Sequence, residues 1–167
     1  MTDRLSAEER SRLMSRVRGT DTQPELWLRR CLHAKGFRYR LHAKELPGRP
    51  DLVLPRYSAV IFVHGCFWHG HDCHLFRLPS TRVDFWREKI DTNRERDRRN
   101  RSKLLDLGWR VLDVWECAMR GKERLDPKEL LDQVEDWIKG PEVTLTVRGD
   151  RSEARHRRQV DTPRGTV

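Results

Sequence analysis

Two cysteines and four histidines lie within a stretch of eleven residues that starts at His64, a density unusual for a plain loop or a core strand. Thiolates and imidazoles are the ligands that zinc prefers in structural sites, where four ligands close a tetrahedron. Cys66, His71 and Cys73 have a C-x4-H-x-C spacing and supply three ligands. Cys117, which follows a predicted strand, is the candidate for the fourth. The pattern predicts a structural Cys3His zinc site that stabilises a loop with no core of its own.

A simpler interpretation of the same residues needs no metal. Cys66 and Cys73 would then be buried thiols and the histidines would lie on the surface. A disulfide between the cysteines is less favoured, because disulfides are rare in reducing compartments. Cys31 lies on the apolar face of a predicted helix and is interpreted as core packing. The density of ligand types favours the zinc site.

Histidines that the zinc site does not use could transfer protons. The pKa of an imidazole lies near neutrality, which suits a general base or acid. His64 and His69 flank Cys66 in the sequence, so a loop held by zinc would keep both imidazoles in fixed positions. Both are therefore candidates for catalysis, with His74 as a third unassigned histidine.

Carboxylates elsewhere in the chain could bind magnesium, which prefers carboxylate oxygens and water. Asp51 begins one predicted strand and His64 ends another, so the two can approach each other in an antiparallel meander, close to the backbone carbonyl of Val63. Glu25 and Asp97 are further candidates. Glu25 also suits a helix cap, however, and Asp97 could pair with neighbouring arginines.

A small set of helices and strands must position these residues. The sequences Ser6–Glu9 and Thr22–Glu25 have the form of capping boxes, and apolar residues at helical spacing follow each. Alternating or continuous apolar runs indicate strands. Helices are predicted over residues 6–17, 23–35, 85–107 and 127–139, and strands over 37–41, 51–54, 59–63 and 109–115. The order favours an α/β or α+β layer fold in which helices surround a mixed sheet of about four strands.

Composition narrows the class of protein. The 167 residues suit one domain, and their net charge is +9, with arginine supplying 28 of the 35 basic residues. The planar guanidinium matches phosphate, so this excess favours nucleic acid as the partner. No run approaches the ~20 apolar residues of a membrane span, and the N-terminus lacks a secretory signal, so we expect a cytoplasmic, nucleoid-associated protein. We expect a DNA-binding arm over residues 1–20, a catalytic domain over 21–140 and a disordered basic tail over 141–167.

Several motifs, in order over roughly residues 10–140, resemble the very short patch repair (Vsr) endonuclease family. They are PGRPD (47–51), VIFVHGCFWH (60–69), FWREKI (85–90), NRERD (93–97), GWRV (108–111) and VWEC (114–117). Two positions depart from the family pattern. Val63 stands where threonine is common, which a backbone carbonyl ligand tolerates, and Gly70 replaces a histidine outside the predicted ligands.

The resemblance implies a restriction-endonuclease-like fold and an enzyme that nicks duplex DNA on the 5′ side of the thymine in a T:G mismatch. Such mismatches arise by deamination of 5-methylcytosine, and the mismatch-repair protein MutL is a partner in that family. The matching positions imply Asp51 and the Val63 carbonyl as ligands of Mg²⁺, and His69 as the base that activates water. Supporting catalytic roles fall to His64, Asp97 and Glu25, the Zn²⁺ ligands are Cys66, His71, Cys73 and Cys117, and the aromatic side chains that enter the DNA stack are Phe67, Trp68 and Trp86.

Two other functions remain open on the residues alone. One is a non-catalytic, zinc-dependent DNA-binding module, for which Asp51 and His69 would be dispensable. The other is a ββα-metal nuclease, whose catalytic ion would lie on the histidine-rich loop and which would not need Cys117. Cutting one strand requires only a monomer, which is the expected state.

Overall fold

The computed structural model of the chain describes residues 19–151, so the arm and helix predicted within residues 1–20 lie almost wholly outside the described residues. A five-stranded sheet of order β1-β2-β3-β4-β5 forms the centre of the molecule. Its strands are β1 (Arg40–Leu41), β2 (Leu52–Leu54), β3 (Ala59–His64), β4 (Arg110–Trp115) and β5 (Thr144–Val147). The first three pair antiparallel, which confirms the predicted meander. β4 then pairs in parallel with β3, and β5 pairs in parallel with β4, so the sheet is mixed as expected.

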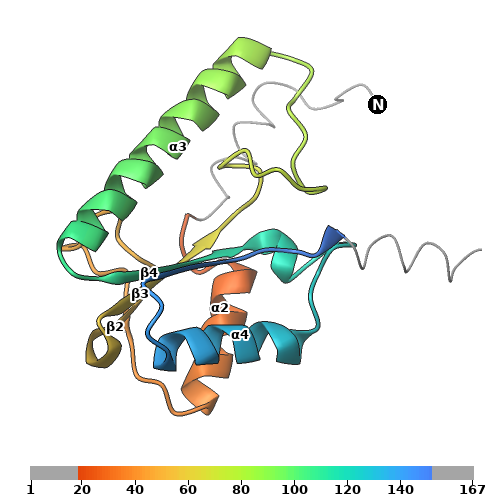
Figure 1. Cartoon of the computed structure of the whole chain (residues 1–167). Coiled ribbons are helices and arrows are strands. Elements are labelled where there is room, and N and C mark those ends of the chain that lie inside the picture. The colour runs from red at the N-terminus through yellow and green to blue at the C-terminus, as the bar shows by residue number, and fades with distance from the viewer. Residues whose placement is uncertain (1–18, 152–167) are drawn as a thin grey trace, which may run out of the picture.

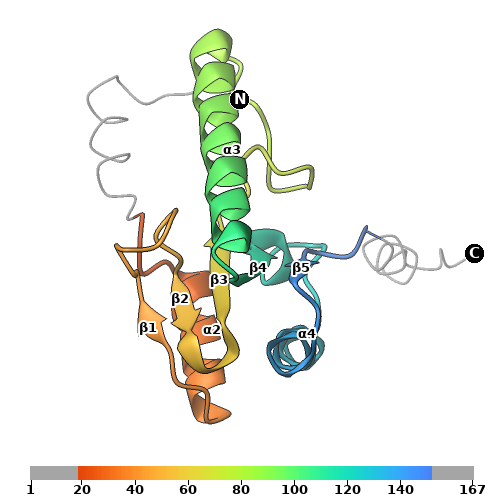
Figure 2. The same cartoon turned by 60° about the vertical axis from the view of Figure 1, so that its left-hand side comes forward.

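Helices cover both faces of this sheet (Figures 1 and 2). α2 (Gln23–Ala34) and α4 (Pro127–Lys139) lie on one face, and the long α3 (Val83–Asp106) rises from the other. Two short 3-10 helices, Pro55–Tyr57 and Glu116–Ala118, follow β2 and β4. The α/β class with helices around a mixed sheet is confirmed.

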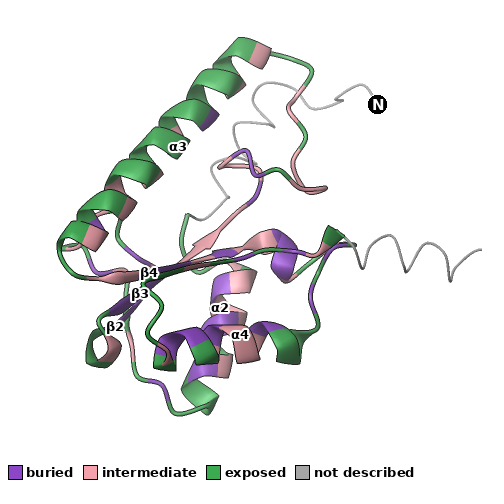
Figure 3. Cartoon of the chain, viewed as in Figure 1, coloured by how far each residue is buried: buried purple, intermediate pink, exposed green. Residues whose placement is uncertain are grey.

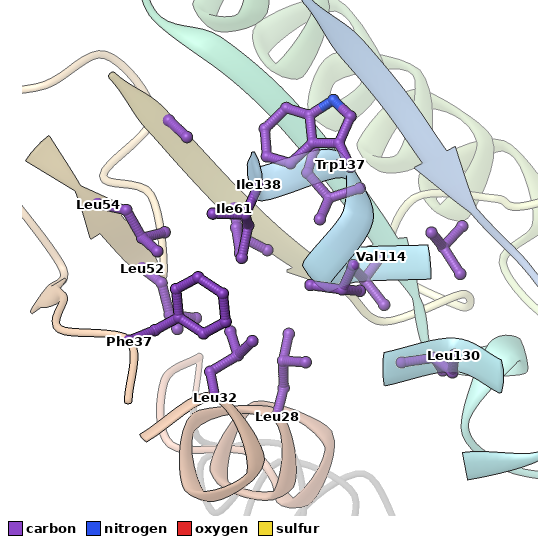
Figure 4. Close-up of a cluster of buried hydrophobic side chains, with 14 of the residues drawn as sticks. Leu28, Leu32, Phe37, Leu52, Leu54, Ile61, Val114, Leu130, Trp137 and Ile138 are labelled. Carbon is purple, nitrogen blue, oxygen red and sulfur yellow. The ribbon is translucent and has the colours of Figure 1, made fainter. Parts of the chain in front are cut away.

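Residues along each strand alternate between these two layers. Leu112 and Val114 of β4 join the large core with α2 and α4, whereas Val111 packs with Leu104 of α3. The large core contains leucines of α2, the inward side chains of the central strands and the apolar face of α4 (Figure 4). Because side chains alternate along a strand, Asp113 and Trp115 of β4 share the α3 face with Val111. His64 of β3 shares that face by the same rule.

Helix α3 is attached to the sheet only near its C-terminal end. Its buried residues are Ile90 and Leu104, and most of the helix is exposed (Figure 3). Ile90 packs under the loop that joins β3 to α3, and Arg94 donates hydrogen bonds to the carbonyls of His69 and Gly70 in that loop. The helix therefore also supports the histidine-rich segment. Within residues 19–151, no helix combines the length and the apolar character that crossing a bilayer requires.

The prediction of a disordered tail from residue 141 is wrong for the residues that form β5. The sequence Thr-Leu-Thr-Val alternates polar and apolar side chains, and Leu145 and Val147 pack against the large core. This segment pairs with β4 through four register positions from Thr144 to Val147. The strand was missed because its short apolar pattern becomes stable only on an existing parallel neighbour. The rest of the predicted tail, residues 152–167, lies beyond the described part of the chain.

Candidate active site and metal centre

A cleft of about 1190 Å³ opens on the α3 face, where β3 and β4 end and β2 begins. Antiparallel pairing brings the start of β2 beside the end of β3, so Asp51 and Val63 meet at one edge of the sheet. The cleft is lined by all the residues predicted for magnesium and proton transfer: Glu25, Asp51, Val63, His64, His69 and Asp97. The sequence-based set is therefore brought together in space.

Asp51 is fixed against the backbone of the neighbouring strand. Its Oδ2 accepts a hydrogen bond of 2.7 Å from the N–H of Val63. Burial raises the pKa of Asp51 to about 6; the Val63 hydrogen bond opposes that rise and the nearby Glu25 adds to it. The other oxygen, Oδ1, lies 3.8 Å from His42 Nδ1. Within residues 19–151, Oδ1 makes no hydrogen bond with another residue, and a buried carboxylate with such an oxygen suits a cation ligand.

His69 and Asp97 form a hydrogen-bonded pair across the cleft, from His69 Nδ1 to Asp97 Oδ2. Although burial raises the pKa of Asp97, the hydrogen bond with His69 and the electrostatic effect of that ring bring the pKa below its usual value. A carboxylate on Nδ1 orients the ring and leaves Nε2 available for proton transfer. The two residues are 28 positions apart.

His64 forms a second pair of the same kind, with a residue that the sequence did not single out. Its Nε2 lies 2.7 Å from Oδ1 of Asp113, whose other oxygen pairs with Arg101 of α3. The His64 and His69 rings meet at an angle of 64° with centroids 4.7 Å apart. Burial lowers the pKa of His64, and the carboxylates of Asp97 and Asp51 oppose that effect. Asp113 was missed because one acidic residue in an apolar strand carries no local signal.

Glu25 is a cap residue and also a buried part of the cleft. Its Oε1 accepts from the Thr22 hydroxyl at 3.0 Å, and its Oε2 accepts from the Asp21 N–H at 3.0 Å. The buried Arg29 donates to Glu25 Oε2 at 2.9 Å and lies 2.8 Å from His42 Nε2. The predicted cap is thus one side of an ion-pair network behind Asp51. Arg29 and His42, the other side, had no sequence signal.

Cys66, His71, Cys73 and Cys117 converge as predicted, with their ligand atoms all within 4.8 Å of one another. His71 Nδ1 is 3.6 Å from Cys66 Sγ and 3.5 Å from Cys117 Sγ. Zn–S bonds of ~2.3 Å and Zn–N bonds of ~2.0–2.1 Å at a tetrahedral angle put S and N about 3.6 Å apart, so the residues present fit zinc. Burial lowers the pKa of His71 to about 4, which keeps the imidazole neutral, and the hydrogen bond with Cys66 lowers the pKa of Cys117 to about 6.

Neighbouring residues complete the surroundings of this Cys3His cluster. Glu116 accepts a hydrogen bond of 3.1 Å from the Cys66 N–H, and the Gly149 N–H donates to Cys117 Sγ at 3.3 Å. A Cβ added to Gly149 would lie 2.6 Å from the carbonyl oxygen of Cys117. The segment after β5 therefore passes directly over the cluster. His74 lies outside both sites, where its Nε2 accepts from the Lys122 N–H at 3.2 Å.

The three aromatic residues predicted to enter DNA form one cluster beside the cleft. The Phe67 ring lies 5.3 Å from the rings of Trp68 and Trp86, and the two indoles are 6.2 Å apart, measured between centroids. All three are half-buried, so each exposes part of a ring. Asn93 of α3 donates to the Trp68 carbonyl at 3.0 Å, which fixes the loop against the helix.

Comparisons with known proteins match the chain to a family model and to several relatives. Residues 2–75 match the family model described as "DNA mismatch endonuclease Vsr". The chain is 49% identical over 140 residues to "DNA mismatch endonuclease Vsr" of Escherichia coli (strain K12), covering 84% of this chain and 90% of that protein. It is 53% identical over 119 residues to "Type II nicking enzyme V.XorIIP" of Xanthomonas oryzae pv. oryzae, covering 71% and 88%. It is 41% identical over 142 residues to "Type II nicking enzyme V.NmeAIP" of Neisseria meningitidis, covering 83% and 100%.

Proposed function

Because the chain belongs to the Vsr family of DNA mismatch endonucleases, we propose that it nicks duplex DNA on the 5′ side of the thymine in a T:G mismatch. The damage would be deaminated 5-methylcytosine, and the reaction is Mg²⁺-dependent hydrolysis of one phosphodiester. The observation that carries the proposal is the meeting of Asp51, His64 and the His69–Asp97 pair in one cleft.

The residues present fit a divalent cation at Asp51. The Asp51 carboxylate lies against the backbone of Val63, so that carboxylate and the Val63 carbonyl would hold Mg²⁺. When bound, the ion supplies positive charge that stabilises the oxygens of the phosphate as the bond breaks. Burial of Asp51 favours this use, because a bound cation compensates for the cost of the buried carboxylate.

His69 acts as the base in this proposal. With Nδ1 directed to Asp97, Nε2 accepts a proton from the attacking water, and the Asp97 carboxylate stabilises the cation that forms. His64 lies in ring contact with His69 and assists from the strand end. Glu25 stays in a supporting role, since its two oxygens are already hydrogen-bonded to Thr22, Asp21 and Arg29.

Recognition of the mismatch depends on the aromatic cluster and on α3. A T:G wobble is easier to unstack than a matched pair. Side chains that insert between neighbouring bases must unstack them, which costs a few kcal/mol per base step. Phe67, Trp68 and Trp86 would insert there. The exposed arginines of α3 would contact phosphates, and residues 1–20 would act as a further DNA-binding arm.

Zinc has a structural role in this proposal. Cys66, His71, Cys73 and Cys117 would bind one Zn²⁺ and hold the loop that carries both His69 and the aromatic residues. We also propose that the protein acts as a monomer in the cytoplasm, at the nucleoid, with MutL as a partner in repair.

A nicking assay tests the proposal. Purified protein is incubated with two labelled duplexes that differ only in one T:G or T:A pair, with and without Mg²⁺. We expect one cut, in the thymine strand of the T:G duplex, only with Mg²⁺. Equal cutting of both duplexes would contradict mismatch specificity. Retained DNA binding without cutting would instead favour the non-catalytic zinc-dependent module.

A further inference from the structure

Asp113 occupies a position in which an apolar residue would be expected. It lies in the middle of β4, between the buried Leu112 and Val114, and its side chain is only 13% exposed. It pairs in register with Phe62 of β3, so its carboxylate lies on the α3 face, two residues before the strand end. A buried carboxylate in a central strand is destabilising unless its oxygens are well paired.

Both oxygens of Asp113 have a partner. Oδ1 lies 2.7 Å from His64 Nε2, and Oδ2 pairs with Nη1 of Arg101 from α3. Arginine has only donors, so Oδ2 accepts, and the guanidinium disfavours a proton on the carboxyl group. Oδ1 must then accept as well. The hydrogen bond therefore requires a proton on Nε2 of His64.

The ring of His64 packs against three other rings. It is stacked on Phe62 with an angle of 12° and centroids 5.7 Å apart. Trp115 and His69 contact it as well, at 4.8 and 4.7 Å between centroids. With Nε2 directed to Asp113, the remaining nitrogen is Nδ1, which makes no hydrogen bond with another residue of the described range 19–151.

We propose that Asp113, held by Arg101, is a positioning residue that keeps the proton of His64 on Nε2 and leaves Nδ1 as a hydrogen-bond acceptor toward the cleft. The cleft then contains two histidine–carboxylate pairs that use different ring nitrogens. His64 binds its carboxylate through Nε2, whereas His69 binds Asp97 through Nδ1 and leaves Nε2 free for the cleft. Water between them can be held by Nδ1 of His64 while Nε2 of His69 removes its proton. The catalytic part of this inference rests on the proposed nicking activity, whereas the tautomer does not.

The substitution Asp113→Asn separates positioning from packing. Asparagine has the same shape but only one acceptor oxygen. Arg101 would claim that oxygen, so the amide NH₂ would face His64. Nε2 would then have to accept, and the proton of the neutral ring would move to Nδ1. The cleft would lose its acceptor with little change in volume.

Nitrogen NMR of the imidazoles reads the tautomer directly, without DNA. The signals of His64 are assigned by their loss in His64→Gln, and the unprotonated nitrogen of a neutral ring resonates far downfield of the protonated one. We expect a protonated Nε2 in the wild-type chain and a protonated Nδ1 in Asp113→Asn. A wild-type His64 with its proton on Nδ1 would overturn the proposal, whether or not Asp113→Asn folds.

A double-mutant cycle tests the link to catalysis. We expect Asp113→Asn to lower the single-turnover nicking rate by about 10- to 100-fold, with DNA affinity and zinc content unchanged. In a His64→Gln background the same substitution should change the rate by less than about twofold, because it acts through His64. An equal loss in both backgrounds would show a merely structural role. Asp106→Asn, on the exposed end of α3, is the matched control. A wild-type chain that cuts no duplex would refute the proposed function and leave the NMR result to decide the tautomer.

Discussion

The indole of Trp115 lies parallel to the imidazole of His71, with an angle of 11° and ring centroids 4.0 Å apart. The same indole contacts the ring of His64 at 4.8 Å and that of His69 at 6.0 Å. One side chain thus packs against a ligand of the Cys3His cluster and against His64 and His69, the two histidines proposed to act in catalysis. Any change that displaces His71 should therefore also shift the rings of His64 and His69.

Loss of the zinc cluster should affect both stability and nicking. We expect Cys117→Ser to bind less than one zinc per chain and to lose several kcal/mol of unfolding free energy, because a structural metal contributes directly to folding. Zinc content by mass spectrometry and urea unfolding measure the two effects. Cys31→Ser, outside the cluster, is the matched control and should keep its zinc. Full zinc occupancy in Cys117→Ser would contradict the Cys3His assignment.

The His69–Asp97 pair should control the rate of cutting without controlling DNA binding. We expect His69→Asn to lower the nicking rate by about 10²- to 10⁴-fold, the usual contribution of a general base. Asp97→Asn should lower it less, by about 10- to 100-fold, because the ring remains but loses its orienting carboxylate. Single-turnover rates and a filter-binding Kd separate the two effects. An unimpaired rate in His69→Asn would remove this residue as the base.

Asp51 should make the metal-free protein less stable as the pH rises. Burial raises the pKa of Asp51 from 3.8 to about 6 in the folded state, so the folded protein holds the proton longer than the unfolded chain does. The protonated carboxyl group of Asp51 makes its full contribution to the free energy of unfolding below pH 4. That contribution, about 3 kcal/mol, is lost as the pH rises through 6. Asp51→Asn should therefore be more stable than wild type at pH 7.5 by up to that amount, and not at pH 4.

Urea unfolding at the two pH values, in magnesium-free buffer, measures the difference for Asp51→Asn. Chelators are omitted so that zinc remains bound. Added Mg²⁺ should stabilise the wild-type protein at pH 7.5 and leave Asp51→Asn unchanged, because only the ionised carboxylate binds the cation. The same stabilisation in both proteins would place the magnesium site elsewhere.

The aromatic cluster should contribute to affinity for mismatched DNA in particular. Removing one stacked ring costs roughly 1–3 kcal/mol per base, so Trp68→Ala should weaken binding to the T:G duplex by roughly 5- to 150-fold. Binding to the matched duplex should change much less, since that duplex stays stacked. Fluorescence anisotropy with both duplexes measures the ratio. Equal weakening on both would show that Trp68 contributes to general binding only.

Gly149 should be needed for the segment that passes over the cysteine cluster. A Cβ at this position would lie 2.6 Å from the carbonyl oxygens of Cys117 and Glu123. We expect Gly149→Ala to cost about 1–3 kcal/mol, the usual effect of overpacking, and to weaken zinc retention against a chelator. Gly19→Ala is the control, because a Cβ there meets no atom of the described residues within 4 Å. Wild-type zinc retention in Gly149→Ala would show that this segment does not support the cluster.

The sequence by itself determined the features that depend on neighbouring residues. Capping by Thr22, the apolar run of β3 and the spacing of Cys66, His71 and Cys73 are all set within a few positions, so local rules could identify them. Asp51 and His64 could be placed together because an antiparallel meander joins the start of one strand to the end of the next.

Tertiary structure alone decided the features that depend on distant partners. Asp113 acquires its role from His64 on β3 and Arg101 on α3, and Arg29 acquires its role from Glu25 and His42. The sequence of β5 is too short and polar to indicate a strand by itself, and the segment becomes a strand because it pairs in parallel with β4. The interactions of a single charged residue, or of a four-residue strand, with its sequence neighbours are too weak to decide where it lies in the fold. Its position is fixed only when burial forces its polar groups to pair with distant partners.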